Sequence, residues 1–313
     1  MSSDLFPAGL IVETFKLNIE EIVEYFNAWN LKSKQMEKGF FSSNITAIHT
    51  PRIQFHDVSY SHGFLTQGTY PNDSIMLGYV QTDGKAIFQN RLLYSNELVI
   101  SSNGDEIDYL SNTKSRIYTI SIEKQFFEDT FFAFFNEDFE KHQVKGRFFI
   151  KPEELSAFLK SIKAWMTFIK HSHVLLLNES KYKILEVKIV EDIFSFIKIE
   201  HHERKKSEFQ IKKARDILHA NIDECFDAEM LTQKLGIGQR QLQRIFKESY
   251  GYSPKKYLLN LRINAVRKEL IEADPESATI STIAMKYHFF DLNHFSKAYK
   301  ALFCELPSQT LQR

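Results

Sequence analysis

The sequence has few of the residues that build phosphate-binding loops and disulfide frameworks. Its 313 residues include 11 glycines, 7 prolines and 2 cysteines. No glycine-rich phosphate loop and no nucleophile elbow occurs. Cys225 and Cys304 stand far apart, without CxxC spacing, which favours reduced thiols over a disulfide or a zinc site.

Long apolar runs are also missing. No stretch of about eighteen consecutive apolar residues occurs, so no membrane-spanning helix is expected. The N-terminal segment Met1-Ser2-Ser3-Asp4 lacks the basic and apolar regions of a secretory signal. These features predict a soluble, cytoplasmic protein with no membrane partner.

Net charge is absent too, which taken alone argues against a nucleic-acid partner. The charges are divided unevenly, however. Residues 1–200 hold 21 Lys and Arg against 26 Asp and Glu, a balance of −5, whereas residues 201–313 hold 19 against 14, a balance of +5. The C-terminal third is therefore the candidate for binding nucleic acid.

The histidine pattern of a metal-dependent cupin enzyme is not found. Such sites use two His separated by one residue, a nearby Glu and a distant His. His49, His56 and His62 are six or seven residues apart, and the His171-Ser172-His173 pair stands near a predicted helix end without a carboxylate pattern. We expect no catalytic residue, metal or cofactor. A cupin-type enzyme with a helical appendage is the less favoured alternative.

Short β-strands dominate the region from residue 31 to residue 122. Turn signals at Pro71-Asn72-Asp73, Asp83-Gly84 and Asn103-Gly104 separate segments rich in β-branched and aromatic residues. Many short strands at this spacing predict a sandwich or a small barrel. The predicted strands are 41–48, 52–60, 74–80, 86–88, 97–102, 106–110 and 116–122.

Helices are predicted on both sides of the strands. Asn18 and Glu21 have the spacing of a capping box and predict a helix to about Trp29. Residues 123–135 hold six phenylalanines, which indicates either an internal helix over the mouth of the β region or an aromatic surface for an apolar ligand or a subunit. Further helices are predicted at 152–170 and 179–203.

The last of these helices has apolar residues near heptad spacing. This pattern is typical of core packing or of a dimer seam, and its length and position favour the seam. We therefore expect a possible homodimer through about 179–203. The residues are Tyr182, Leu185, Ile189, Ile193, Phe196 and Ile197.

Two helix-turn-helix units are predicted near the C-terminus. The first pairs a helix at 228–237, ended by Gly236, with a helix at 238–249. The second pairs 279–289 with 292–303, and Asp291 is placed to cap the latter. A long helix at 257–270 would hold the two units at a fixed distance.

The second helix of each unit has a polar outer face. Arg bonds the edge of guanine with two parallel hydrogen bonds, Gln can do the same with adenine, and Lys suits phosphate. This composition is typical of helices that enter a DNA groove. The outward residues are Gln239, Arg240, Gln243, Arg244 and Lys247 in the first unit, and Asn293, Ser296, Lys297 and Lys300 in the second.

From residue 228 to residue 307 the chain resembles the DNA-binding domain of the AraC/XylS family of bacterial transcription regulators. The resemblance rests on several short motifs at fixed spacing. They are Leu242-x-Arg244-x-Phe246, Gly251-x-Ser253-Pro254-x-x-Tyr257, Arg262-x-x-x-Ala265, Ile283-Ala284, Phe289, His294-Phe295-Ser296-x-x-Tyr299-Lys300, Phe303 and Pro307-Ser308.

The resemblance implies a transcription regulator, an activator that binds promoter DNA and works with RNA polymerase. It implies base contacts by Arg240, Gln243 and Arg244 in the first unit and by Asn293, Ser296 and Lys297 in the second, with Gln239, Lys247 and Lys300 nearer phosphate. In this family the partner domain is often a cupin-like jelly roll that binds a small effector. The element order weakly resembles the ethanolamine-operon and aromatic-amine regulators. Control by a partner protein is the alternative.

Three positions depart from the family pattern. Members usually have Gly where this chain has His288 and Cys304, and commonly Ser where it has Gly238. Because Gly tolerates positive φ and other residues do so poorly, the two replacements affect the turns of the second unit. We expect sequence discrimination to depend more on the first unit.

The predicted fold class is α+β, with an N-terminal cupin-like β-barrel, flanking helices and a C-terminal all-α domain. The predicted domains are 1–200 for sensing and dimerisation (barrel about 31–122, helices 123–200), a linker at 201–207, and 208–313 for DNA binding. Polar residues inside strand segments are candidates for orienting an effector. For any single one of them, a surface side chain or a satisfied core hydroxyl is the favoured interpretation. The candidates are Arg52, His56, Tyr79, Arg91, Tyr94, Tyr109 and Tyr118.

Overall fold

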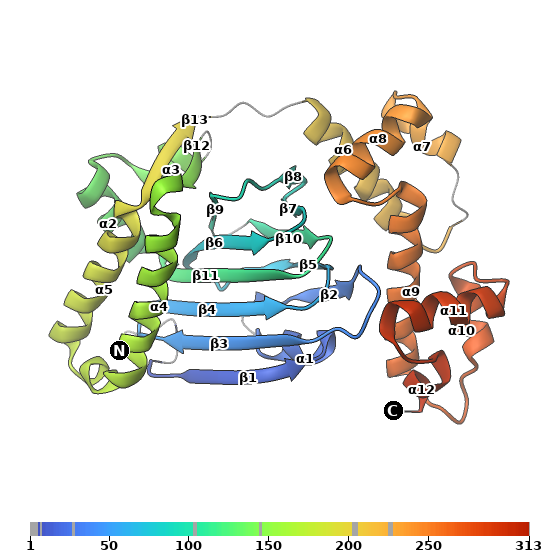
Figure 1. Cartoon of the computed structure of the whole chain (residues 1–313), viewed down its shortest axis with the longest axis horizontal. Coiled ribbons are helices and arrows are strands. Elements are labelled where there is room, and N and C mark those ends of the chain that lie inside the picture. Colours follow the sequence, from blue (N-terminus) through green and yellow to red (C-terminus); the bar gives the residue numbers. More distant parts are fainter. Residues whose placement is uncertain are drawn as a thin grey trace.

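The computed structural model describes residues 6, 8–26, 29–102, 105–143, 146–201, 206–224 and 228–312. Two antiparallel sheets with flanking helices form the N-terminal part, and helices alone form the C-terminal part (Figure 1). The predicted α+β class is confirmed. Cys225 and the Asn103-Gly104 turn lie outside the described residues.

The first sheet is antiparallel and has eight strands in the order β1-β3-β4-β11-β6-β9-β12-β13. Its centre is β11, which pairs along its whole length with β4 on one side and β6 on the other. The strands are β1 (Ile11–Leu17), β3 (Ser43–His49), β4 (Ile53–Tyr60), β6 (Ser74–Thr82), β9 (Glu97–Ser102), β11 (Ser115–Glu123), β12 (Gly146–Ile150) and β13 (Ile197–His201).

The second sheet has five strands in the order β2-β5-β10-β7-β8. Side chains from both sheets share one apolar core, so the sheets face each other as a sandwich. Among the described residues the two sheets remain separate, which corrects the prediction of a closed barrel. The strands are β2 (Lys32–Gln35), β5 (Phe64–Thr69), β7 (Ala86–Phe88), β8 (Arg91–Leu92) and β10 (Glu106–Ser111).

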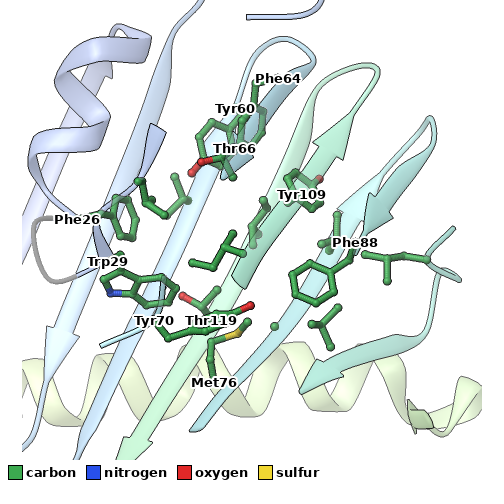
Figure 2. A pocket seen from close by; sticks show the side chains of 18 residues that line it. Phe26, Trp29, Tyr60, Phe64, Thr66, Tyr70, Met76, Phe88, Tyr109 and Thr119 are labelled. Carbon is green, nitrogen blue, oxygen red and sulfur yellow. The ribbon is translucent and has the colours of Figure 1, made fainter. Parts of the chain in front are cut away.

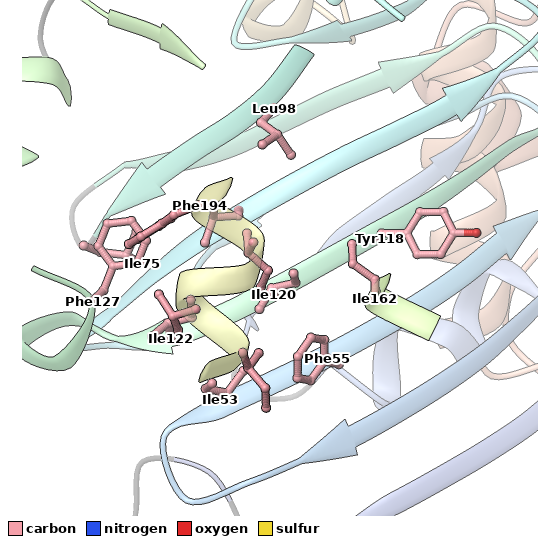
Figure 3. Packing of buried hydrophobic residues seen from close by; sticks show 14 of the residues in the cluster. Ile53, Phe55, Ile75, Leu98, Tyr118, Ile120, Ile122, Phe127, Ile162 and Phe194 are labelled. Atoms are coloured by element: carbon pink, nitrogen blue, oxygen red, sulfur yellow. The ribbon is translucent and has the colours of Figure 1, made fainter. Parts of the chain in front are cut away.

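Three helices cover the outer face of the first sheet: α2 (Lys124–Phe135), α4 (Leu155–His171) and α5 (Glu179–Ser195). Phe127 of α2 and Phe194 of α5 lie against the sheet beside Ile75 and Ile122 (Figure 3). Half of the phenylalanines of α2 are buried there, whereas Phe132 and Phe134 are exposed. The helix covers the outer face of the first sheet, whereas the internal-helix interpretation placed it over the mouth of the β region. The smaller elements of this region are α3 (Phe139–Gln143), η2 (Pro152–Glu154) and η3 (His173–Leu177).

The helix predicted at 179–203 is shorter than expected. It ends at Ser195, and β13 follows. Ile189 and Ile193 are 0% and 2% exposed, because the heptad stripe packs into the core that α5 shares with the first sheet. The chain's own core therefore occupies the face that was predicted as a dimer seam.

The predicted capping box at the start of α1 (Ile19–Glu24) is confirmed. The Asn18 side chain accepts a hydrogen bond from the Glu21 amide at 2.8 Å, and Glu21 accepts one from the Asn18 amide at 2.7 Å. The helix is shorter than predicted. Six strands with weak or broken alternation were not predicted, namely β1, β2, β5, β8, β12 and β13.

In the described residues from 206 onward, seven helices form the C-terminal part, on the opposite side of the sandwich from α4 and α5 (Figure 1). The long helix α9 contributes Leu261 to the core of the first helix-turn-helix unit and Val266 to the core of the second. Helix α6 was not predicted. The helices are α6 (Lys206–Ala220), α7 (Ala228–Leu235), α8 (Gln239–Tyr250), α9 (Pro254–Glu272), α10 (Ile280–Lys286), α11 (Leu292–Phe303) and α12 (Pro307–Leu311).

Candidate DNA-binding surface and effector cavity

The first helix-turn-helix unit consists of α7 and α8. Helix α7 is followed by Gly236 at φ 62°, a left-handed conformation that suits glycine. Gly238 is the N-cap of α8 and supplies no side-chain cap, so the departure from Ser leaves an amide without that partner. Leu242 and Phe246 of α8 are buried in the core of the unit.

The other face of α8 is open to solvent. Arg244 makes only a long contact with Glu248, 3.4 Å between Nη1 and Oε1, and its side chain is 62% exposed. An exposed guanidinium held this loosely is free to turn toward a base edge. All five predicted contact residues of this helix are exposed, namely Gln239, Arg240, Gln243, Arg244 and Lys247.

The second unit consists of α10 and α11. Thr279 caps α10, and Asp291 caps α11 by accepting hydrogen bonds from the amides of Asn293 and His294, each at 3.0 Å. The cap at Asp291 is predicted by the sequence. Tyr299 and Phe295 are fully buried. Of the predicted contact residues, Asn293, Lys297 and Lys300 are exposed and Ser296 is half-buried.

Both positions at which the family has Gly have left-handed backbone here. His288 has φ 63° and Cys304 has φ 60°, and Cys304 is the C-cap of α11. The turns therefore keep the geometry that glycine would favour, at the cost of steric strain on a Cβ. The His288 ring compensates in part, because its Nε2 lies 2.6 Å from the Asp223 carbonyl oxygen.

Comparison with known proteins supports the assignment of these helices. A family model described as a helix-turn-helix domain matches residues 231–313. The chain is 30% identical over 102 residues to the probable thc operon regulatory protein of Rhodococcus erythropolis, covering 33% of this chain and 31% of that protein. It is 29% identical over 93 residues to XylDLEGF operon transcriptional activator 3 of Pseudomonas putida, covering 30% and 28%.

A probable AraC family transcriptional regulator from Rhodopseudomonas palustris is similar as well. It is 30% identical, and the match covers 34% of this chain and 96% of that one, with a TM-score of 0.32. In its C-terminal part, the chain is similar to AraC-type transcriptional regulators. Against the two curated relatives, the matched segment spans less than a third of their length. The similarity therefore concerns the helix-turn-helix region.

An apolar cavity lies inside the sandwich, between the two sheets (Figure 2). Its volume is about 80 Å³. Trp29 and Phe26 close one side, and Phe64, Phe88 and Tyr109 of the second sheet line another. Burial raises the pKa of Tyr109 to about 12, so its hydroxyl stays protonated. Among the residues that line the cavity, none has a charged side chain.

The seven predicted effector residues are dispersed, and of these only Tyr109 is among the residues that line the cavity. Tyr79 and Tyr118 belong to the core on the opposite face of the first sheet. Arg52 pairs with Glu186, and Arg91 pairs with Glu97.

The remaining two candidates also lie outside the cavity. Tyr94 is 49% exposed. His56 is buried behind the cavity wall, against the rings of Phe26 and Trp29. The candidates were polar residues within strands, whereas the lining is mostly apolar. Apolar side chains of this kind occur in every buried strand, so no sequence signal distinguishes the lining from ordinary core.

In the described part of the chain, no group of three or more His, Cys, Asp or Glu side chains is placed to hold a metal ion. No described helix is both long enough and apolar enough to cross a membrane.

Proposed function

We propose that the chain is a sequence-specific transcriptional activator that binds promoter DNA through α8 and α11. We call these the recognition helices. The observation that supports this most directly is the match of residues 231–313 to the helix-turn-helix model, together with the exposed cationic and amide side chains on both helices. The recognition helices then enter successive major grooves roughly 34 Å apart on one face of the duplex.

The proposed contacts divide by chemistry. Arg240, Gln243 and Arg244 bond base edges, because their planar groups make paired hydrogen bonds that differ between bases. Lys247 contacts phosphate as a point charge. In the second unit Asn293, Ser296 and Lys297 face bases. Gln239 of the first unit and Lys300 of the second lie nearer phosphate.

We further propose that the activator responds to a small, uncharged, apolar effector bound in the cavity of the sandwich. The lining has no charged side chain, and an unpaired ion in such a site costs several kcal/mol. The volume of about 80 Å³ is smaller than the roughly 150 Å³ of an apolar cavity that holds benzene. An effector must therefore push the walls apart.

The position of the cavity explains how such a movement could reach the DNA-binding helices. One face of the second sheet lines the cavity, and its other face packs on the DNA-binding domain. Leu65 and Ile87 belong to the core of the first helix-turn-helix unit, whereas their strand neighbours Phe64 and Phe88 line the cavity. A single β-sheet therefore separates the cavity from the core of the first helix-turn-helix unit.

The remaining parts of the proposal follow from this function. A promoter-binding activator acts in the cytoplasm with RNA polymerase and carries out no catalysis. We propose residues 1–200 as the sensing domain, 201–207 as the linker and 208–313 as the DNA-binding domain. Within these linker bounds His201 belongs to β13, residues 206–207 belong to α6, and residues 202–205 lie outside the described part of the chain. A homodimer, if it forms, needs a surface other than the buried stripe of α5.

Selection from a pool of random duplexes tests the DNA-binding function. The wild-type chain should enrich one motif and bind it at least about 10³-fold more tightly than a scrambled duplex at physiological salt. Equal binding to all duplexes would contradict the proposal.

Calorimetric titration with benzamide and benzoate tests the effector class, because the two probes match in size and differ in charge. Benzamide should bind and benzoate should not. Substituting Val99, which lines the cavity, with Phe should abolish benzamide binding by filling the space. If neither probe binds and native mass spectrometry finds no retained small molecule, control by a partner protein is favoured instead.

A further inference from the structure

The first recognition helix ends against the β sandwich. The ammonium group of Lys85, in the turn between β6 and β7, donates hydrogen bonds to the carbonyl oxygens of Lys247 and Glu248, the former at 3.4 Å. Both carbonyls lie in the last turn of α8, where the Lys247 carbonyl also accepts a hydrogen bond from the Gly251 amide at 3.1 Å. A cation at a helix C-terminus also interacts favourably with the helix dipole.

The second recognition helix is held in the same way by a different part of the sandwich. The side-chain amide of Gln35, at the end of β2, donates a hydrogen bond to the carbonyl oxygen of Leu302 at 2.5 Å. The Gly39 amide donates to the same oxygen at 3.3 Å. Leu302 is the penultimate residue of α11, and Gln35 is 1% exposed. The contact is therefore buried and made without competition from solvent.

The helix between the two units is fixed to the same strand. Asn264 of α9 accepts a hydrogen bond from the Gln35 amide at 3.0 Å and donates one to the Gln35 carbonyl at 2.8 Å. Asn260 donates to the Met36 carbonyl at 2.7 Å. Strand β2 is an edge strand, whose outer backbone groups would otherwise be unpaired. The two asparagines thus take the place of a neighbouring strand.

These contacts leave the DNA-facing surface free. They lie at the C-terminal ends of both recognition helices, whereas a recognition helix contacts base edges mainly with its N-terminal residues. Arg240 and Asn293, near the N-terminal ends, are exposed. The arrangement is therefore compatible with bound DNA.

We propose that the β sandwich sets the spacing and relative orientation of the two recognition helices, with Gln35 and Lys85 as positioning residues. The inference depends on the proposed DNA-binding function and goes beyond it. Helix α9 alone connects the two units through one covalent path. The sandwich adds a second, non-covalent connection that restrains both helices at their far ends. The N-terminal part of the chain is then a template that limits which operator spacings are accepted.

Binding to spacing variants of one operator tests the proposal. The probe is the duplex that the wild-type chain selects from a random pool, with two base pairs inserted between its two groove segments. Two base pairs turn one segment by about a fifth of a helical turn relative to the other. We expect the full-length wild-type chain to lose at least about tenfold in affinity on this insertion.

Lys85→Ala should reduce that loss to about threefold or less, while its affinity for the uninserted duplex falls by less than about threefold. Lys85→Arg, which keeps a cation at the end of α8, should behave as wild type. Gln35→Ala should act as Lys85→Ala does if it folds, as checked by circular dichroism. Lys114→Ala is the matched control, because Lys114 pairs with Asp83 on the same side of the sandwich at 3.0 Å and its side chain is 66% exposed. It should keep the tenfold loss.

The outcomes separate the two proposals. A chain that shows no sequence preference contradicts the DNA-binding function. The positioning role alone is overturned if binding is specific but the ratio of affinities for the uninserted and inserted duplexes is the same in wild type, Lys85→Ala and Lys85→Arg. The positioning role is also overturned if Lys85→Ala lowers the affinity for every spacing by the same factor. That result is expected of a lysine that only adds stability or phosphate affinity.

Discussion

Tyr109 and Leu110 are adjacent in β10, yet they face different parts of the molecule. Tyr109 lines the apolar cavity, whereas Leu110 packs in the core shared with α8 and α9. Side chains alternate across a strand, so a displacement of one is transmitted through the backbone to the other. β10 therefore joins the candidate effector site to the DNA-binding helices without any intervening residue.

The ion pair between Asp108 and Arg215 fixes this strand to α6. The side chains are 11% and 6% exposed. Removing Arg215 leaves the Asp108 charge buried and unpaired, and removing Asp108 leaves Arg215 with its longer contact to Asp216 at 3.8 Å. We expect Asp108→Ala and Arg215→Ala each to lower the free energy of unfolding by about 3–5 kcal/mol. Urea denaturation of both single variants and of the double variant measures this. The double variant should lose clearly less than the sum of the two, and additive losses would show that the pair is not coupled.

Arg244 and Lys247 should differ in how their loss affects DNA binding. Arg244→Ala is expected to cost about 1–3 kcal/mol on the selected duplex and to relax the preference at one base position. Lys247→Ala should weaken binding to all sequences alike and lower the salt dependence by about one counterion. Isotherms on selected and scrambled duplexes at several salt concentrations measure both. Equal losses of Arg244→Ala on the two duplexes would rule out its role at a base edge.

Replacing Cys304 with glycine should stabilise the folded chain. The Cys304 φ of 60° strains a Cβ, and glycine removes that strain at the C-cap of α11. We expect Cys304→Gly to raise the free energy of unfolding by about 1 kcal/mol. Cys304→Ala, which removes the thiol and keeps the Cβ, is the control and should bring no gain. A rise of the same size in both variants would assign the effect to the thiol instead.

Two buried histidines should make stability depend on pH. Burial lowers the pKa of His49 to about 4, and burial with the nearby His49 lowers the pKa of His56 to about 3. Histidine in the unfolded chain has a pKa near 6.5, so between these values the unfolded state binds more protons. Stability is therefore full above about pH 6.5 and falls as the pH decreases, by up to about 1.4 kcal/mol per pH unit for each histidine.

Urea denaturation between pH 5 and pH 8 measures this slope while staying above the range in which carboxylates titrate. The variant His56→Gln keeps a hydrogen-bonding side chain near Thr119 and removes one titrating group. It should show a shallower slope than wild type, whatever its stability at pH 8. An unchanged slope would mean that His56 is accessible to protons in the folded state.

The helix-turn-helix units could be predicted from the sequence because their signals are local. Apolar spacing places Leu242 and Phe246 on one face of a helix, and Asp291 begins the next by capping its first amides. Period-two alternation likewise located seven strands. The failures concern short or irregular segments such as β2, where four residues carry too little pattern to be recognised. The predicted helix at 179–203 was too long because β13 continues its apolar content.

The family resemblance, the two recognition helices and their outward residues can be read from local patterns in the chain, since these depend on contacts within a few turns of helix. The residues that enclose the cavity and those that hold the recognition helices are known only from the folded structure. Gln35 and Leu302 are 267 positions apart and meet only when β2 and α11 are packed together. No pattern along the chain encodes such a contact, because it depends on how the two parts of the molecule dock.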